Sequence, residues 1–199
     1  IEEGLEFCTA HGLTLQQLAF LSRKAHVLLT AGDVEASRVA MGQARTFFDQ
    51  LRFPAPVYSA DYLVARFTHD LYDLEATAGS GDKSAASARK TAWQSGRSAV
   101  RMARHYARYQ TRVYRLMGRY YWLIGKQKTA MKWWRHAVKT GEALGARPAL
   151  SRTYFEVGRR LLESRSRCHA FADLSGNACL ERAQAIFGEL GLQWDMDEL

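Results

Sequence analysis

The 199-residue chain is poor in proline and cysteine and has no long hydrophobic run. Only 3 Pro and 15 Gly exclude a collagenous or low-complexity chain, and 47% hydrophobic with 24% charged residues are values of a globular protein. No apolar stretch approaches the roughly 18 residues of a membrane-spanning helix, which predicts a water-soluble protein without a membrane partner. The three cysteines, Cys8, Cys168 and Cys179, are odd in number and form no CxxC pair, so we expect a reducing, cytoplasmic compartment.

The sequence also lacks the motifs of catalytic and cofactor-binding sites. It contains no HExxH, no GxxxxGK[ST] and no GxGxxG. His69 and Asp70 are adjacent, Cys168 and His169 have no second ligand pair at a zinc spacing, and Cys8 belongs to no recognisable nucleophile motif. We therefore expect no catalytic residues, no cofactor and no metal site, and a chain that is not itself an enzyme.

The strongest positive signal is an internal repeat. One segment resembles the tetratricopeptide repeat, with an aromatic, a large apolar residue, glycine and tyrosine on a first helix, then alanine, an aromatic and alanine on a second. The matching residues are Tyr114, Met117, Gly118, Tyr121, Ala130, Trp134 and Ala137. This spacing predicts a helical hairpin in which Gly118 allows close approach of two helices and Gly125 forms the turn.

The same frame extends over the rest of the chain with insertions. Tyr154, Gly158 and Ala183 take the roles of Tyr114, Gly118 and Ala137, with six extra residues around 165–177. The second-helix alanine recurs at Ala44, Ala103, Ala137 and Ala183, and only one of these intervals, from Ala103 to Ala137, is the standard period of about 34 residues. The expected helices span 14–30, 33–51, 58–78, 82–109, 111–124, 127–144, 148–163 and 177–190.

These patterns predict an all-α fold, a right-handed solenoid of tetratricopeptide-like antiparallel hairpins with degenerate repeats. The chain is expected to form one repeat domain that belongs to a larger protein. The hairpins are expected at 13–53, 57–110, 111–146 and 147–192, with residues 1–12 as the tail of a preceding repeat.

A second set of residues lies in the last part of the chain. It comprises Ala143, Leu144, Gly145, Ala146, Arg147, Pro148, Arg152, Thr153, Tyr154, Phe155, Gly158, Arg159, Leu161, Leu162, Leu180, Glu181, Ala183, Ile186, Phe187, Leu190, Gly191, Trp194 and Asp195. With these residues, the region 112–199 resembles the C-terminal helical region of large bacterial signalling proteins. There it follows a class III adenylate/guanylate cyclase or an AAA/STAND-type regulatory ATPase module. The resemblance implies that any catalytic activity lies elsewhere in the parent protein.

Charge is distributed unevenly. Residues 83–141 contain 15 Lys and Arg and no Asp or Glu, whereas the rest of the chain has 13 basic and 20 acidic residues. Seven arginines within this block recur at intervals of three or four, which aligns them along one helix face. They are Arg97, Arg101, Arg104, Arg108, Arg112, Arg115 and Arg119. A turn near residues 109–111 would divide this arginine stripe between two adjacent helices.

Two hypotheses account for the arginine stripe. It pairs internally with carboxylates of the array, or it forms a face for an anionic partner, with Tyr109 and Tyr120 beside it. We expect internal pairing before Tyr109, with Asp61, Asp70, Asp73 and Glu75 as the carboxylates, and an open face after it.

The leading functional prediction is a non-catalytic scaffold for protein–protein interaction and regulation. It would bind a protein partner or another domain of its parent. The alternative is a nucleic-acid-binding helical repeat that uses the arginines and tyrosines of residues 97–119.

Overall fold

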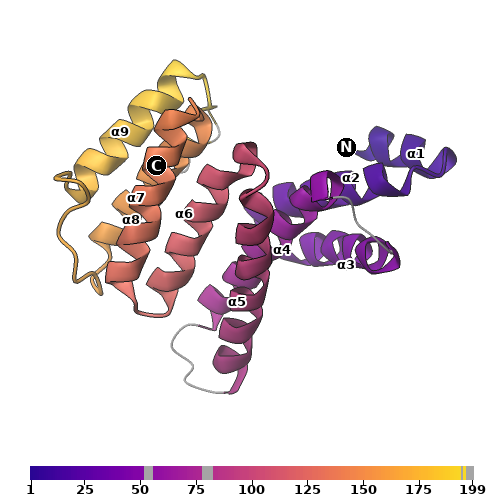
Figure 1. Cartoon of the computed structure of the whole chain (residues 1–199), viewed down its shortest axis with the longest axis horizontal. Helices are drawn as coiled ribbons and strands as arrows, with labels where there is room; N and C mark the ends of the chain where they lie inside the picture. The colour runs from indigo at the N-terminus through magenta and orange to yellow at the C-terminus, as the bar shows by residue number, and fades with distance from the viewer. Residues whose placement is uncertain (52–55, 78–82, 194, 196–199) are drawn as a thin grey trace. The chain divides into compact units, whose positions relative to one another are not determined.

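The computed structural model describes residues 1–51, 56–77, 83–193 and 195, and Figure 1 shows their helices. The nine helices of the described residues are α1 (Glu2–Ala10), α2 (Thr14–Thr30), α3 (Val34–Gln50), α4 (Pro56–Ala76), α5 (Lys83–Ala103), α6 (Ala107–Leu123), α7 (Gln127–Ala143), α8 (Arg147–Leu162) and α9 (Gly176–Glu189). These residues form no strand, only an isolated bridge between Phe171 and Leu174. The prediction of an all-α chain is therefore confirmed.

The chain divides into two compact units. Unit 1 is Ile1–Met102 and contains α1 to α5 except for the last residue of α5, and unit 2 is Ala103–Leu199 and contains α6 to α9. The boundary lies inside the hairpin expected for residues 57–110. Unit 1 has 11 Lys and Arg against 11 Asp and Glu, whereas unit 2 has 17 against 9. The whole formal net charge of +8 therefore belongs to unit 2.

Five helices end in the same kind of turn. Each turn contains a glycine whose φ lies between +59° and +83°, a left-handed conformation that other residues rarely adopt. These glycines are Gly12, Gly32, Gly125, Gly145 and Gly191. The residue after each glycine donates its N–H to the carbonyl five residues earlier, as Lys126 does to Tyr121 at 2.8 Å. Gly125 therefore forms the turn that the repeat pattern predicted.

Short polar residues and a proline mark several helix starts. The Asp33 carboxylate accepts a hydrogen bond from the amide of Ala36 at 3.1 Å, and the Ser175 hydroxyl accepts one from Ala178 at 3.2 Å. Both bonds satisfy first-turn N–H groups that have no partner within the helix. Pro148 lies in the first turn of α8, where its missing N–H removes no helical hydrogen bond.

Two glycines fix the close approach of the paired helices in unit 2. A Cβ at Gly118 on α6 would lie 2.2 Å from Nε1 of Trp134 on α7. A Cβ at Gly158 on α8 would lie 2.8 Å from the Leu180 side chain on α9. Trp134 and Leu180 are 46 residues apart, as are Ala137 and Ala183, so both hairpins place equivalent positions in contact.

The predicted repeat positions form much of the interior of unit 2. Tyr121 is partly buried, and the other nine are buried, namely Tyr114, Met117, Gly118, Ala130, Trp134, Ala137, Tyr154, Gly158 and Ala183. The residues between α8 and α9 add Phe171, which is 1% exposed and packs against the core cluster that contains Tyr154. The six-residue insertion thus contributes to the core.

Unit 1 contains the hairpin of α2 and α3, packed against α4. Its apolar cluster includes Leu18, Ala44 and Tyr62, and the Tyr62 ring stacks on Phe48 with centroids 4.3 Å apart. A buried polar contact accompanies this cluster. The hydroxyl of Ser37 on α3 donates to the Ala25 carbonyl on α2 and contacts Nε2 of His69 on α4 at 2.7 Å. Polar atoms from three helices therefore meet inside unit 1.

Most expected helix bounds agree with the structure within two residues, and those around the arginine-rich turn do not. The helix expected at 82–109 ends at Ala103, and α6 begins at Ala107 instead of 111. Tyr106, with φ −132° and ψ 93°, precedes α6 in an extended conformation. The arginine spacing runs through this turn, and no glycine or proline marks it. Residues 79–81, which separate the helices expected at 58–78 and 82–109, lie outside the described residues.

None of the helices in the described parts of the chain is long and apolar enough to cross a membrane.

Candidate functional site

The predicted arginine stripe is divided between two helices and the turn that joins them. Two of its members lie on α5, one in the turn and four on α6, in the order Arg97, Arg101, Arg104, Arg108, Arg112, Arg115 and Arg119. The first four are exposed and the last three are partly buried. The expectation of an open face after Tyr109 is therefore wrong, because that face of α6 packs toward α8.

The two tyrosines expected beside the stripe are interior residues. Tyr109 is 7% exposed and Tyr120 is 4% exposed. The guanidinium of Arg108 lies 4.8 Å from the centroid of the Tyr109 ring, so a cation already covers that ring. The prediction that these tyrosines accompany the arginines on a binding surface is therefore wrong.

Three of the four carboxylates expected to pair with the stripe form ion pairs within unit 1. The pairs are Arg23 with Asp61 at 2.9 Å, Arg66 with Asp70 at 3.9 Å and Arg38 with Asp73 at 3.2 Å. None of these three arginines belongs to the stripe. These ion pairs do not support the internal pairing expected for the part before Tyr109.

The partly buried arginines of α6 meet a carboxylate of α8. Oε1 of Glu156 accepts a hydrogen bond from Nε of Arg160 at 2.9 Å, and Nη1 of Arg115 lies 3.9 Å from Oε2 of Glu156. The side chains of Glu156, Arg160 and Arg115 are 12%, 11% and 17% exposed. Other arginines interact electrostatically with these three residues. We call the whole set the α6–α8 arginine cluster. Its members are Arg112, Arg115, Arg119, Arg152, Glu156 and Arg160.

A second carboxylate extends the cluster along α8. Glu163, just after the helix, accepts hydrogen bonds from Nη1 of Arg160 at 2.6 Å and from the indole N–H of Trp122 at 2.9 Å. Nε of Arg165 donates to the same carboxylate at 2.6 Å. Glu163 therefore joins the cluster to the aromatic core of unit 2.

The Arg152 guanidinium lies at the other end of this row. Its Nε and Nη2 donate to the two carboxylate oxygens of Asp195, each at 2.6 Å. This two-pronged geometry matches the planar fork of arginine to the two oxygens of a carboxylate.

Helical periodicity explains why these charges gather. The charged positions that face each other are 112, 115 and 119 on α6, and 152, 156 and 160 on α8 with 163 just after it. Intervals of three and four place each set on one helix face. The row on α6 was predicted from the arginine spacing, whereas the row on α8 was missed, although its charged residues recur at the same intervals.

The Arg115 guanidinium has an unusual electrostatic environment. The pKa of Arg115 is lowered from 12.5 to about 10, and burial is the largest cause. Attraction to Glu156 partly offsets this shift by raising the pKa, and repulsion from Arg112, Arg152 and Arg119 contributes to the lowering. Like charges are therefore crowded around this guanidinium.

Glu156 has the opposite shift. Burial alone would raise its pKa, but attraction to three arginines outweighs burial and lowers the pKa from 4.5 to about 2. The arginines, in order of effect, are Arg119, Arg160 and Arg115. Glu156 is therefore a charged carboxylate that several cations share.

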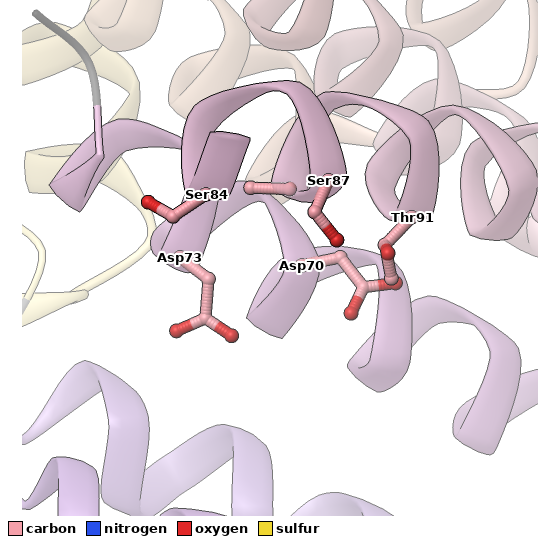
Figure 2. Close-up of a pocket in the computed structure, with 6 residues that line it drawn as sticks. Asp70, Asp73, Ser84, Ser87 and Thr91 are labelled. Atoms are coloured by element: carbon pink, nitrogen blue, oxygen red, sulfur yellow. The ribbon is translucent and has the colours of Figure 1, made fainter. Parts of the chain in front are cut away.

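A separate pocket of about 360 Å³ lies in unit 1 between α4 and α5. Two carboxylates and three hydroxyls line it, from Asp70, Asp73, Ser84, Ser87 and Thr91 (Figure 2). Burial raises the pKa of Asp70, while the Ser95 hydroxyl and Arg66 lower it. Such a lining accepts hydrogen bonds from a cation or a polar group. Among the described residues, no three His, Cys, Asp or Glu side chains are grouped to hold a metal ion.

Comparison of the chain with protein-family models, curated proteins and solved structures finds no match. The tetratricopeptide and signalling-protein resemblances rest on the residues quoted above.

Proposed function

We propose that the chain is a non-catalytic scaffold of helical hairpins that binds a protein partner, or another segment of a larger parent protein, through unit 2. The observation that carries this proposal is the division of charge, because unit 2 holds the whole net charge of +8 and unit 1 is neutral. A strongly cationic surface accelerates association with acidic partners and disfavours basic ones. Unit 2 is therefore the unit that selects a partner by charge.

The hairpins support a repeat scaffold. The pairs α6/α7 and α8/α9 each place a first-helix glycine, Gly118 or Gly158, against the second helix. Helical repeats of this kind stack into right-handed solenoids with extended binding surfaces. Together with the resemblance of residues 112–199, this supports a place in the repeat tail of a signalling protein. Cyclase or ATPase chemistry would belong to another module of that protein.

The alternative is a nucleic-acid-binding helical repeat. The exposed side chains of Arg101, Arg104 and Arg108 favour it, because phosphate contacts need accessible cations. The burial of Tyr109 and Tyr120 weighs against it, because single-stranded nucleic acids bind by stacking bases on exposed rings. We therefore favour a protein partner.

Two measurements with the full chain separate these functions. In the first, the chain is crosslinked in an extract of its source cells, and a protein found repeatedly is purified and titrated back. Saturable binding by the purified protein supports the scaffold, and failure of every candidate to rebind contradicts it. In the second, a fluorescent single-stranded oligonucleotide is titrated at about 50 and 200 mM salt. Micromolar affinity that falls steeply with salt supports the alternative, and we expect no such binding.

A further inference from the structure

We propose that the solvent face of α7 binds an acidic helical segment of a protein partner through a row of four cations. This α7 cation row consists of Lys128, Lys132, Arg135 and Lys139. The proposal rests on the proposed scaffold function and deepens it, since it names where unit 2 binds and which chemistry the partner presents.

The first argument is the position of the row on the helix. Its members recur at intervals of four, three and four residues, which aligns them along one face of α7. All four are exposed, whereas the opposite face is buried and contains Ala130, Trp134 and Ala137. From Lys128 to Lys139 the helix rises about 17 Å. A partner can therefore reach every cation of the row without any rearrangement of unit 2.

The second argument is that these cations have no counter-charge within the described part of the chain. No side chain of the row forms an ion pair, a hydrogen bond or a cation–π contact with another described residue. Other cations of unit 2 are paired, as Arg160 is with Glu156 at 2.9 Å and with Glu163 at 2.6 Å. The row instead places like charges one helical turn apart, which disfavours a helix. An acidic partner would supply the counter-charges that the row lacks.

The third argument is the sign of the charge at the end of the row. Glu142 follows Lys139 by three residues and is exposed, so the row ends in the opposite charge. A protein segment can match this pattern with a few carboxylates followed by a neutral or basic residue. A nucleic acid is negative at every phosphate, so a strand that continues past the row would meet the Glu142 carboxylate. Both tryptophans of α7 are partly or fully buried, which leaves bases little surface for stacking.

The spacing of the row favours a helical partner. A helix with Asp or Glu at intervals of four, three and four residues presents its carboxylates along one face with the same rise as the row. These intervals read the same in both directions, so the partner helix can lie along α7 in either orientation. The row therefore selects carboxylates by their alignment as well as by their charge.

The test compares two fluorescent peptides rich in alanine and glutamine, with identical compositions. In the aligned peptide, four glutamates recur at intervals of four, three and four residues, and in the scattered peptide they are distributed around the helix. Binding to the full chain is measured by anisotropy at about 20 mM salt, where exposed charges are screened little. We expect the aligned peptide to bind at least about threefold more tightly. Equal affinities, or no binding of the aligned peptide, would overturn the proposal.

The variant Lys132→Gln/Lys139→Gln removes two cations of the row, and we expect it to weaken the aligned peptide at least about fivefold. Glutamine has nearly the helix propensity of lysine, and both positions are exposed, so the variant should fold. The matched control is Arg104→Gln/Arg167→Gln, at two exposed positions of unit 2 outside the row. It should change the affinity less than about twofold. Equal losses in both variants would overturn the proposal, because binding would then depend only on net charge.

Two further measurements keep the result unambiguous. If circular dichroism shows that the double variant does not fold, Lys132→Gln replaces it, and an unchanged affinity then overturns the proposal. A double-stranded oligonucleotide is titrated alongside the peptides. If it binds more tightly than the aligned peptide and loses affinity in the row variant, the assignment to an acidic protein segment is wrong.

The purified partner distinguishes failure of this site from failure of the scaffold function. If the partner binds Lys132→Gln/Lys139→Gln as tightly as the unmodified chain, the row is not its site, while the scaffold function stands. If no candidate partner binds the unmodified chain although the aligned peptide does, the scaffold function fails and the row remains a surface that binds carboxylates.

Discussion

The indole of Trp134 lies against the backbone of Gly118, so closely that a Cβ at 118 would be 2.2 Å from the indole nitrogen. The same nitrogen donates a hydrogen bond to the carbonyl of Arg115 at 3.1 Å. Trp134 is fully buried, so the ring cannot move aside without opening a cavity in unit 2. The contact therefore fixes both the spacing and the rotation of α6 against α7.

Gly118→Ala is expected to destabilise unit 2 by at least about 1–3 kcal/mol, because the added methyl overlaps the Trp134 ring. The matched control is Gly188→Ala on α9, where a Cβ would meet nothing within 4 Å. We expect that control to be neutral or to stabilise by about 0.5–1 kcal/mol, since alanine favours a helix more than glycine does. Urea unfolding followed by tryptophan fluorescence reports mainly on unit 2, which holds four of the five tryptophans. Equal stabilities of the two variants would contradict this account of the contact.

Ala137→Leu is expected to cost about 1–3 kcal/mol, because Ala137 is fully buried beside the same interface and has no room for three more carbons. Ala143→Leu, at an exposed position of the same helix, provides the comparison and should be close to neutral. The free energies of unfolding of both variants are measured against the unmodified chain. A tolerated leucine at 137 would show that α7 and its neighbours repack easily.

The sequence predicted the hairpin contacts of unit 2 because those contacts depend on residue size at fixed spacing. Gly118, Ala137, Gly158 and Ala183 stand out as small residues in a helical frame, and all four are buried where helices meet. Phe171 was missed, because a buried side chain between two helices has no periodic neighbours that mark it.

The arginine stripe was harder to predict because spacing alone does not show what covers a helix face. Arg115 and Arg108 occupy equivalent positions in the stripe, and only the row of charges on α8 distinguishes them. That row includes Glu156, whose role depends on the packing of two helices about 40 residues apart in sequence. The position of the turn after Ala103 could not be predicted from the sequence either, because the residues of this turn are compatible with a continuous helix.

His69 is expected to make stability depend on pH. Burial lowers its pKa from 6.5, with smaller effects from Asp73, which raises it, and Arg38, which lowers it. The folded state therefore favours neutral His69, whereas the unfolded chain takes up a proton first as the pH falls below about 6.5. We expect the free energy of unfolding to decrease on acidification from about pH 7.5 to 5.5, by circular dichroism.

The contribution of His69 is isolated by comparing two variants. His69→Gln should flatten the pH dependence in this range, because glutamine does not titrate. His169→Gln, at an exposed position, should leave the dependence as in the unmodified chain. If His69→Gln keeps the full dependence, another group causes it.

Glu156→Gln is expected to destabilise unit 2 by about 3–5 kcal/mol, because it removes the carboxylate that balances several partly buried arginines. Burial would raise the pKa of Glu156, but Arg119, Arg160 and Arg115 lower it to about 2, below its ordinary 4.5. The carboxylate therefore contributes its full stability above about pH 4.5, and the contribution is lost as the pH falls toward 2. Glu156→Gln should lack that acid-sensitive part of the unfolding free energy.

Glu181→Gln on α9 is the control, because it removes the same charge from an exposed position of unit 2. It should change the stability little and preserve the loss of stability in acid, which separates the effect of Glu156 from a change in net charge. Urea unfolding by tryptophan fluorescence at about pH 7, 4.5 and 3 measures all three proteins. Because removing Glu156 leaves its arginines facing one another, added salt should reduce the defect by screening their repulsion. A defect of equal size in both variants, or one that salt leaves unchanged, would show that Glu156 does not hold the arginines of α6 and α8 together.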